Sequence, residues 1–102
     1  MKKITVLYKH PSDAEKFKTY YKETHLPLVD KIEGLAKAEI TEIQGELGGE
    51  PSDYFLMAEL YFKTEEQMQE SMGSTEGQAV ANDLSNFATG GVTIIIGNTV
   101  NW

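Results

Sequence analysis

The segment from Tyr54 to Phe62, YFLMAELYF, constrains the fold more than any other part of the chain, because apolar side chains occupy both of its faces. Alternate residues of a β-strand point to opposite faces of a sheet. One face of this segment therefore carries Tyr54, Leu56, Ala58, Leu60 and Phe62, and the other carries Phe55, Met57 and Tyr61. Such a strand is covered on both sides. Helices can cover only one side, so the second needs a partner, most simply another copy of the chain.

Hydrophobic periodicity predicts three further strands. The alternation of Ile4, Val6 and Tyr8 predicts the first. Residues 35–44 form the second predicted strand, and the β-branched segment GVTIIIGNTV, residues 91–100, forms the last. The glycine-rich residues between the second and third strands, GELGGEPSD, are typical of a flexible hairpin loop.

The first helical region contains a proline. Its apolar stripe repeats at steps of three or four and predicts a helix from about Asp13 to Thr24; the stripe consists of Ala14, Phe17, Tyr21, Thr24, Leu28 and Ile32. Pro27 cannot donate a hydrogen bond to the carbonyl of Glu23, and its ring disfavours helical geometry at Leu26. We therefore expect a kink before Pro27 and a short second piece that Gly34 ends.

The second helical region lies between the last two strands. Thr64-x-x-Gln67 is a capping box for a short helix, and Ser74 or Thr75 begins another helix that ends near Ala88. The complete order, β-α-β-β-α-β, predicts an α+β fold of the ferredoxin-like type, with a single domain over residues 1–102.

The composition disfavours several classes of function. The net charge is −7 and every cationic residue is a lysine, so the chain lacks the basic surface that DNA and RNA require. Cysteine is absent, which excludes disulfides and thiolate nucleophiles and is compatible with a reducing cytoplasm. The apolar stretch near the N-terminus is too short for a signal peptide, and no segment approaches the ~20 apolar residues of a membrane span. We expect a cytoplasmic protein that binds neither nucleic acid nor membrane.

His25 is the first candidate for chemistry. It lies four residues after Tyr21 and two before Pro27, so it shares with Tyr21 the helix side that faces the sheet. It can act as a general acid–base or hydrogen-bonding group in a pocket between helix and sheet. Alternatively, it bonds a carbonyl that the proline leaves free. Glu23 and Asp30 do not complete a recognised metal-ligand spacing with it, so we expect no metal site.

Asp83 is the second candidate, three residues after Val80 and four before Phe87 on a stripe predicted to be buried. A buried carboxylate needs a partner. Asp83 can pair with a lysine, cap the following turn, or orient His25 across the pocket. Aromatic and soft side chains that can line such a pocket, although they are equally typical of a core, are Tyr8, Tyr21, Phe55, Met57 and Phe87.

Two stretches resemble the EthD family. YYKETHLPLVDKIEGLAKAEI, residues 20–40, is similar to the family's Tyr-x-x-x-His-x-Pro-Leu segment, and STEGQAVANDLSNFATGGVTIIIG, residues 74–97, resembles its C-terminal half. The resemblance carries His25, Asp83 and Phe87 onto motif positions of the family. It implies a dimeric α/β barrel, in which two ferredoxin-like sheets pack face to face with the helices outside.

The resemblance implies two classes of function. The founding protein of the family is linked to the breakdown of ethyl tert-butyl ether beside a cytochrome P450 system. In the first class the chain binds a small hydrophobic or aromatic metabolite and uses His25, oriented by Asp83, for cofactor-free acid–base catalysis, or it has an oxidoreductase-associated role in catabolism. In the second class the same pocket holds a ligand without turnover, as an accessory protein for a partner oxidoreductase.

Overall fold

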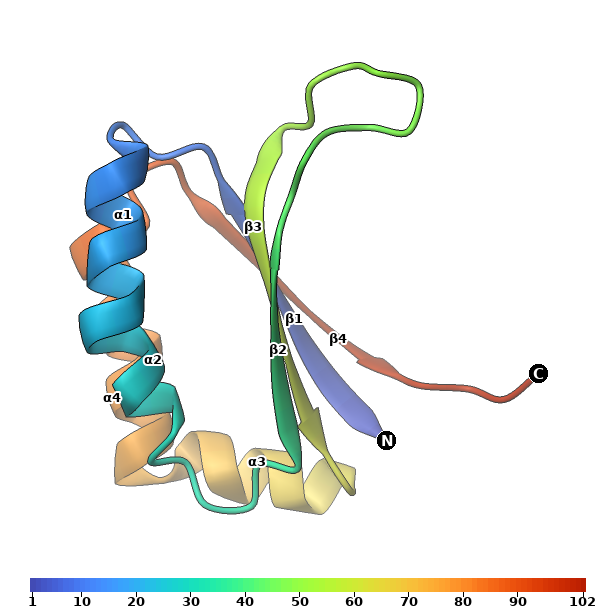
Figure 1. Ribbon diagram of the computed structural model, residues 1–102. Helices are drawn as coiled ribbons and strands as arrows, with labels where there is room; N and C mark the ends of the chain where they lie inside the picture. The colour runs from blue at the N-terminus through green and yellow to red at the C-terminus, as the bar shows by residue number, and fades with distance from the viewer.

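The protein, described over residues 1–102 by a computed structural model, is a four-stranded antiparallel sheet with its helices on one face (Figure 1). The strands are β1 (Lys2–Lys9), β2 (Lys37–Glu42), β3 (Tyr54–Phe62) and β4 (Val92–Asn98). They lie in the order β2-β3-β1-β4. The helical segments are α1 (Ala14–Tyr20), η1 (Tyr21–His25), α2 (Leu26–Val29), α3 (Glu65–Gly73) and α4 (Thr75–Phe87). This order and this sheet confirm the predicted α+β ferredoxin-like fold.

The predicted strands are all present, with differences confined to their ends. β3 has the predicted bounds, and its buried residues alternate along the strand: Leu56, Ala58, Leu60 and Phe62. β2 and β4 are shorter than the predicted residues 35–44 and 91–100. At the ends of β2, the amides of Ala36 and Ile43 still bond to carbonyls of β3, so the sheet frays there without losing its register.

The helix passes Pro27 without a break, and the non-helical geometry predicted at Leu26 is not found. Leu26 has helical dihedral angles, φ −58° and ψ −40°, and its amide bonds the carbonyl of Tyr21, five residues earlier. The segment η1 is therefore a π-helical turn placed just before the proline. A π turn holds one more residue than an α turn, which lets the helix continue where Pro27 cannot donate to Glu23.

The π turn also corrects the predicted apolar stripe. The buried residues are Phe17, Tyr21, His25, Val29 and Ile32. Thr24, which the regular spacing placed on the stripe, is exposed, because the wider turn brings the following residue inward. The helix ends at Val29 rather than at Gly34, and the amides of Lys31 and Ile32 continue in tighter turns to carbonyls three residues earlier. Gly34 then turns the chain with φ +87°.

The helices cover the two central strands and leave β4 open. Ile94 and Ile96 face the helical side, opposite Val6 and Ile4 of β1, yet they are 50% and 61% exposed. Ile95, on the other face, is 52% exposed. No helix lies on that other face, and both the β2–β3 loop and the C-terminal residues project away from the helices (Figure 1). None of the helices combines the length and the apolarity that crossing a membrane requires.

We expect Gly77→Ala to lower the free energy of unfolding by about 1–3 kcal/mol, the usual range for overpacking. Gly77 lies in the first turn of α4, where an added Cβ would overlap the end of α3, 2.6 Å from Cα of Met72. The matched control is Gly73→Ala, because nothing lies within 4 Å of a Cβ at that position. Urea denaturation measures the free energy of unfolding of both variants. Equal values for Gly77→Ala and Gly73→Ala would show that α3 and α4 are not closely packed at this point.

Candidate functional site

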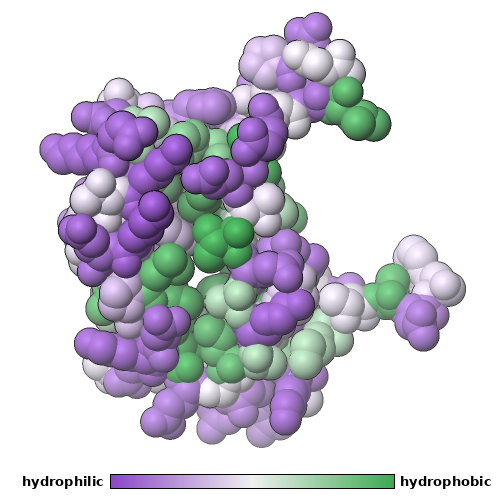
Figure 2. Space-filling model, viewed as in Figure 1, coloured by the Kyte–Doolittle hydropathy of each residue, from purple (hydrophilic) through white to green (hydrophobic).

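The helices and the sheet enclose a cavity of about 180 Å³ that is lined almost wholly by apolar side chains. Val6 of β1 and Ala58 of β3 form its floor, and Val29 and Val80 contribute from the two helical regions. Figure 2 shows apolar residues gathering in the hollow between the helical layer and the sheet. The cavity lies in the place predicted from the sequence for a pocket between helix and sheet.

His25 lines this cavity and is only 2% exposed. Its Nδ1 lies 2.9 Å from Oδ2 of Asp83 on α4. The rings of Tyr21 and Phe87 pack against the imidazole, with centroids 5.1 and 4.7 Å away. Since Nδ1 is turned to Asp83, Nε2 is the ring nitrogen that remains for a ligand.

Asp83 pairs with His25 and not with a lysine. Its second oxygen, Oδ1, accepts hydrogen bonds from the Tyr20 hydroxyl at 2.6 Å and from Nδ2 of Asn86 at 2.9 Å. The carboxylate is buried, as the stripe of α4 predicted. Three roles were considered for Asp83: pairing with a lysine, capping the following turn, and orienting His25. The structure shows the contact with His25.

Burial lowers the pKa of His25, and the neighbouring Asp83 opposes this effect only in part. For Asp83, burial disfavours the charged form, but hydrogen bonds from Tyr20, Asn86 and His25 together lower its pKa. Near neutral pH, His25 is therefore neutral and Asp83 is ionised. An ionised carboxylate only accepts hydrogen bonds, so Nδ1 carries the imidazole proton and Nε2 is unprotonated.

Tyr8 and Tyr21 lie at the same cavity and are both buried. Burial raises the pKa of Tyr8 and raises that of Tyr21 to about 12, so both hydroxyls stay protonated near neutral pH. Their rings meet edge to face with centroids 5.7 Å apart. Phe17, which was not among the predicted pocket residues, stacks on Tyr21 at 5.7 Å and completes an aromatic wall beside His25.

Three of the predicted pocket residues, Phe55, Met57 and Phe87, do not line the cavity; Phe87 contacts the His25 ring but lines the outer surface. Met57 neighbours Ala58, which lines the cavity, so strand alternation points Met57 to the opposite face of the sheet. Phe55 lies where the pairing of β1 and β3 shifts register, and its ring packs against Phe17 of α1 and His10 outside the cavity. The sequence could not decide which face of this doubly apolar strand the helices cover.

Besides Phe17, two polar residues of the site were not predicted from the sequence, Tyr20 and Asn86. Asn86 follows Asp83 by three residues on α4, a spacing at which helical side chains meet. The sequence therefore contained a signal for the contact between Asn86 and Asp83. Tyr20 lies 63 residues from Asp83, and only the packing of α1 against α4 brings the two together.

No three histidine, aspartate or glutamate side chains lie close enough to hold a metal ion. Glu23 and Asp30 are exposed, whereas His25 points inward. His25 therefore lies on a different side of the helix from both carboxylates, and the three residues do not form a cluster.

The protein is a ferredoxin-like α+β protein with a buried His–Asp pair at an apolar cavity. Comparisons with known proteins identify its family. The EthD domain model matches residues 9–91. An uncharacterized 11.0 kDa protein of Rhodococcus erythropolis, from the thcB-thcC intergenic region, is 35% identical over 95 residues, which cover 93% of this chain and 91% of that protein. The crystal structure of an EthD family protein from Bacillus halodurans is 38% identical with a TM-score of 0.92, over 98% of this chain and 99% of that one. The chain belongs to the EthD family.

Two more distant structures share the fold alone. One is a dimeric protein of unknown function with a ferredoxin-like fold from Bacteroides fragilis, with 16% identity and a TM-score of 0.68 over 96% of this chain and 95% of that one. The other is SnoaB of Streptomyces nogalater, a cofactor-independent oxygenase, with 9% identity and a TM-score of 0.67 over 99% and 93% of the two chains.

We expect acidification below pH 6.5 to destabilise the protein through His25. Its pKa in the folded chain is lower than the ordinary value of 6.5, so between the two values the unfolded chain binds more protons. The free energy of unfolding therefore falls as the pH drops. The pKa of Asp83 is lowered from 3.8, so protonation of Asp83 reduces the free energy of unfolding further in more acidic solution.

Urea denaturation at pH 7 and pH 5 measures this effect. His25→Gln should reduce the difference between the two pH values, because it removes the titrating ring. His10→Gln is the matched control, since His10 is exposed and lies outside the cavity. An unchanged pH dependence in His25→Gln would show that His25 does not titrate differently in the folded and unfolded chains.

Proposed function

We propose that this protein binds a small apolar or aromatic molecule in the helix–sheet cavity and that the His25–Asp83 pair moves a proton on that molecule. The observation that carries the proposal is a buried imidazole at the wall of an apolar cavity, with Nδ1 bonded to a carboxylate at 2.9 Å. Such a pair has the parts of a general base: an unprotonated nitrogen, and a fixed charge that stabilises the imidazolium once it forms.

The chemistry of the cavity favours a neutral ligand of about one ring. The chain has no arginine, and no lysine lines the cavity. An anionic ligand would therefore lie unpaired near the charge of Asp83. Apolar cavities of about 150 Å³ admit benzene, so a volume of about 180 Å³ suits a small substituted or fused ring. Ile40 and Ile94 line the cavity and are partly exposed, which gives a ligand a route from the sheet edges.

The proposed chemistry uses side chains alone. Nε2 of His25 takes a proton from the ligand, and the Nδ1–H bond to Asp83 strengthens as the ring becomes charged. The protonated ring then returns the proton to another atom of the ligand or to water. SnoaB, described as a cofactor-independent oxygenase, has the same fold, and this likeness agrees with a site that carries no cofactor.

A base in an apolar cavity should catalyse the ring opening of 1,2-benzisoxazole, a neutral fused-ring probe. Nε2 removes the proton at C3, the ring N–O bond breaks, and 2-cyanophenolate forms, whose absorbance measures the rate. His25→Gln should lower the rate by roughly 10²–10⁴-fold, the usual contribution of a positioned proton-transfer group. The wild-type rate should fall as the pH drops through the lowered pKa of His25.

A cavity-filling variant and its matched control separate binding of the probe from its ring opening. Ala58→Leu fills the cavity floor and should abolish binding of the probe, whereas Ala38→Leu, on the exposed strand β2, should not. Binding of the probe without ring opening would favour the non-catalytic alternative, an accessory ligand-binding protein. Ring opening at equal rates in the wild type and in His25→Gln, per folded molecule, would remove His25 from the mechanism.

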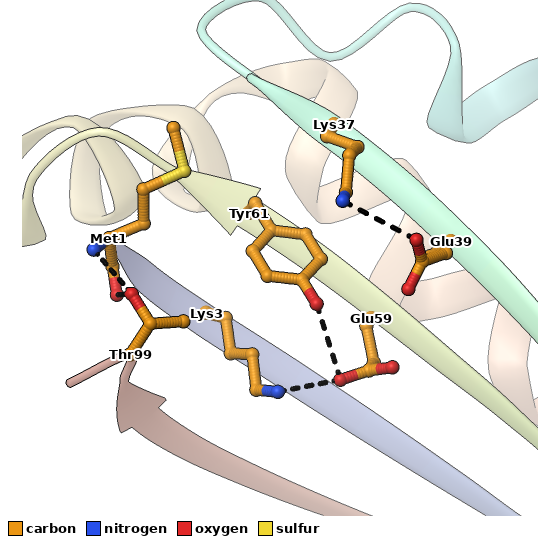
Figure 3. Close-up of polar contacts among 7 residues, drawn as sticks. All are labelled: Met1, Lys3, Lys37, Glu39, Glu59, Tyr61 and Thr99. Carbon is orange, nitrogen blue, oxygen red and sulfur yellow. Dashed lines mark hydrogen bonds and ion pairs between the residues drawn. The ribbon is translucent and has the colours of Figure 1, made fainter. Parts of the chain in front are cut away.

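The open face of the sheet is proposed to pack against the same face of a second copy of the chain. β4 exposes isoleucines on both of its faces, and Leu47 and Trp102 are fully exposed on the segments that project beyond the open face. Charges on this face are paired within the chain: Lys3 lies 2.6 Å from Glu59, and Lys37 lies 3.4 Å from Glu39 (Figure 3). Covering the face therefore covers these four charges together with their partners. The Bacteroides fragilis protein of the same fold is described as dimeric.

Light scattering at micromolar concentration should give twice the chain mass of 11.4 kDa. Ile95→Asp should shift the protein towards the monomer, because it places an unpaired carboxylate in the proposed interface. Thr19→Asp adds the same charge on exposed helix α1, away from the open face, and should leave the mass unchanged. A wild-type protein of single chain mass would contradict the homodimer.

A further inference from the structure

Asp83 receives more hydrogen bonds than its pairing with His25 requires. We propose that Tyr20 and Asn86 are positioning residues for the proton transfer, which hold the Asp83 carboxylate so that His25 presents an unprotonated Nε2 to the cavity. This inference rests on the proposed function, and it assigns roles to two residues that touch neither the cavity nor a ligand. We refer to Tyr20, Asn86 and their bonds to Asp83 as the outer clamp.

The geometry of the outer clamp divides the two carboxylate oxygens between two tasks. Tyr20 of α1 and Asn86 of α4 both donate to Oδ1, at 2.6 and 2.9 Å. Oδ2 is left to Nδ1 of His25 at 2.9 Å. A carboxylate gripped at one oxygen by donors from two helices cannot rotate freely. Oδ2 therefore stays directed at Nδ1, and the imidazole keeps the tautomer in which Nε2 is a hydrogen-bond acceptor.

The same clamp packs against the ring that contacts His25. The ring of Tyr20 stacks on Phe87, with centroids 5.4 Å apart and planes 28° apart. Phe87 in turn lies 4.7 Å from the imidazole. The orientation of Tyr20 and that of His25 are therefore set by one aromatic side chain between them.

The outer clamp lies on the solvent side of the His–Asp pair. Tyr20 and Asn86 line a shallow groove of about 130 Å³ on the outer surface, separate from the inner cavity. Asp13 and Lys16 also line this groove, but neither bonds to Asp83. Asp83 itself is buried, so the clamp separates its charge from water.

The groups that face His25 are few. Asp83 approaches it from α4, Tyr21 lies beside it on η1, and Tyr8 rises from β1. Both tyrosines keep their protons near neutral pH, because burial raises their pKa values. Asp83 is therefore the single charge that acts directly on the imidazole, and any group that alters its charge distribution alters the basicity of His25.

The direction of that change follows from electrostatics. Two donors on Oδ1 disperse the negative charge of Asp83. Removing either donor concentrates the charge on Oδ2, next to Nδ1, and favours the imidazolium. Tyr20→Phe and Asn86→Ala should therefore each raise the pKa of His25 relative to the wild type.

Nitrogen NMR of the imidazole tests this inference without any ligand. In the wild type near neutral pH, the spectrum should show a protonated Nδ1 and an unprotonated Nε2. The titration midpoint of His25 should move to higher pH in Tyr20→Phe and in Asn86→Ala. Tyr61→Phe and Asn82→Ala are the matched controls and should leave it unchanged, because Tyr61 lies on the open sheet face, near Glu59, and Asn82 is exposed on α4.

A purely structural role would lower stability in the two clamp variants but leave the His25 midpoint where it is in the wild type, and that result would overturn the inference. Asn86 is exposed, so its variant keeps the test decisive even where Tyr20→Phe folds poorly. With 1,2-benzisoxazole, the acidic limb of the pH–rate profile should shift upward in the same variants. A failure of ring opening in the wild type would contradict the proposed function alone, since the NMR titration decides the clamp independently.

Discussion

The missing amide hydrogen of Pro27 determines how the first helical segment meets the sheet. The chain responds with a π turn instead of a break, so α1, η1 and α2 form one continuous helical segment. The extra residue of that turn places His25, and not Thr24, on the inner face. The bond from His25 to Asp83 then joins this segment to α4, and the cavity forms beneath the joined helices. Unusual turns of this type are frequent at functional sites, and here the turn positions the imidazole.

Two opposing effects set the charge state of the site. Burial disfavours charge on both His25 and Asp83. Asp83 remains ionised because three donors bond it, whereas His25 has a single polar partner and remains neutral. The distribution of hydrogen bonds, rather than burial alone, therefore decides which of the two residues carries the charge. A neutral base next to a fixed carboxylate is the arrangement that general-base chemistry requires near neutral pH.

The sequence predicted the fold because each element carried a local signal of its own. Burial alternates along β3 from Leu56 to Phe62, and Thr64 and Ser74 cap the two later helices through their side chains, as expected. The π turn could not be predicted, because it depends on how much strain a continuous helix tolerates at Pro27. Spacing placed His25 and Asp83 on inward-facing stripes, but they are 58 residues apart, and spacing alone cannot bring two helices together. The prediction for Met57 failed for a similar reason, since the helices could have covered either face of a strand that is apolar on both. Phe55 does pack against Phe17 of α1, at a register shift in β3, but it lies away from the cavity.

The position of β1 in the sheet has a consequence for how the chain folds. β1 is the first strand in chain order, yet it is central in the sheet, and its neighbours β3 and β4 start at Tyr54 and Val92, far along the chain from Lys2. Its pairing therefore closes very long loops, and loop-closure entropy opposes such contacts until many of them form together. Domains dominated by non-local pairs fold slowly. During synthesis, the first strand has to wait for the last one before its second edge is satisfied, and until then it is exposed to pairing with other chains.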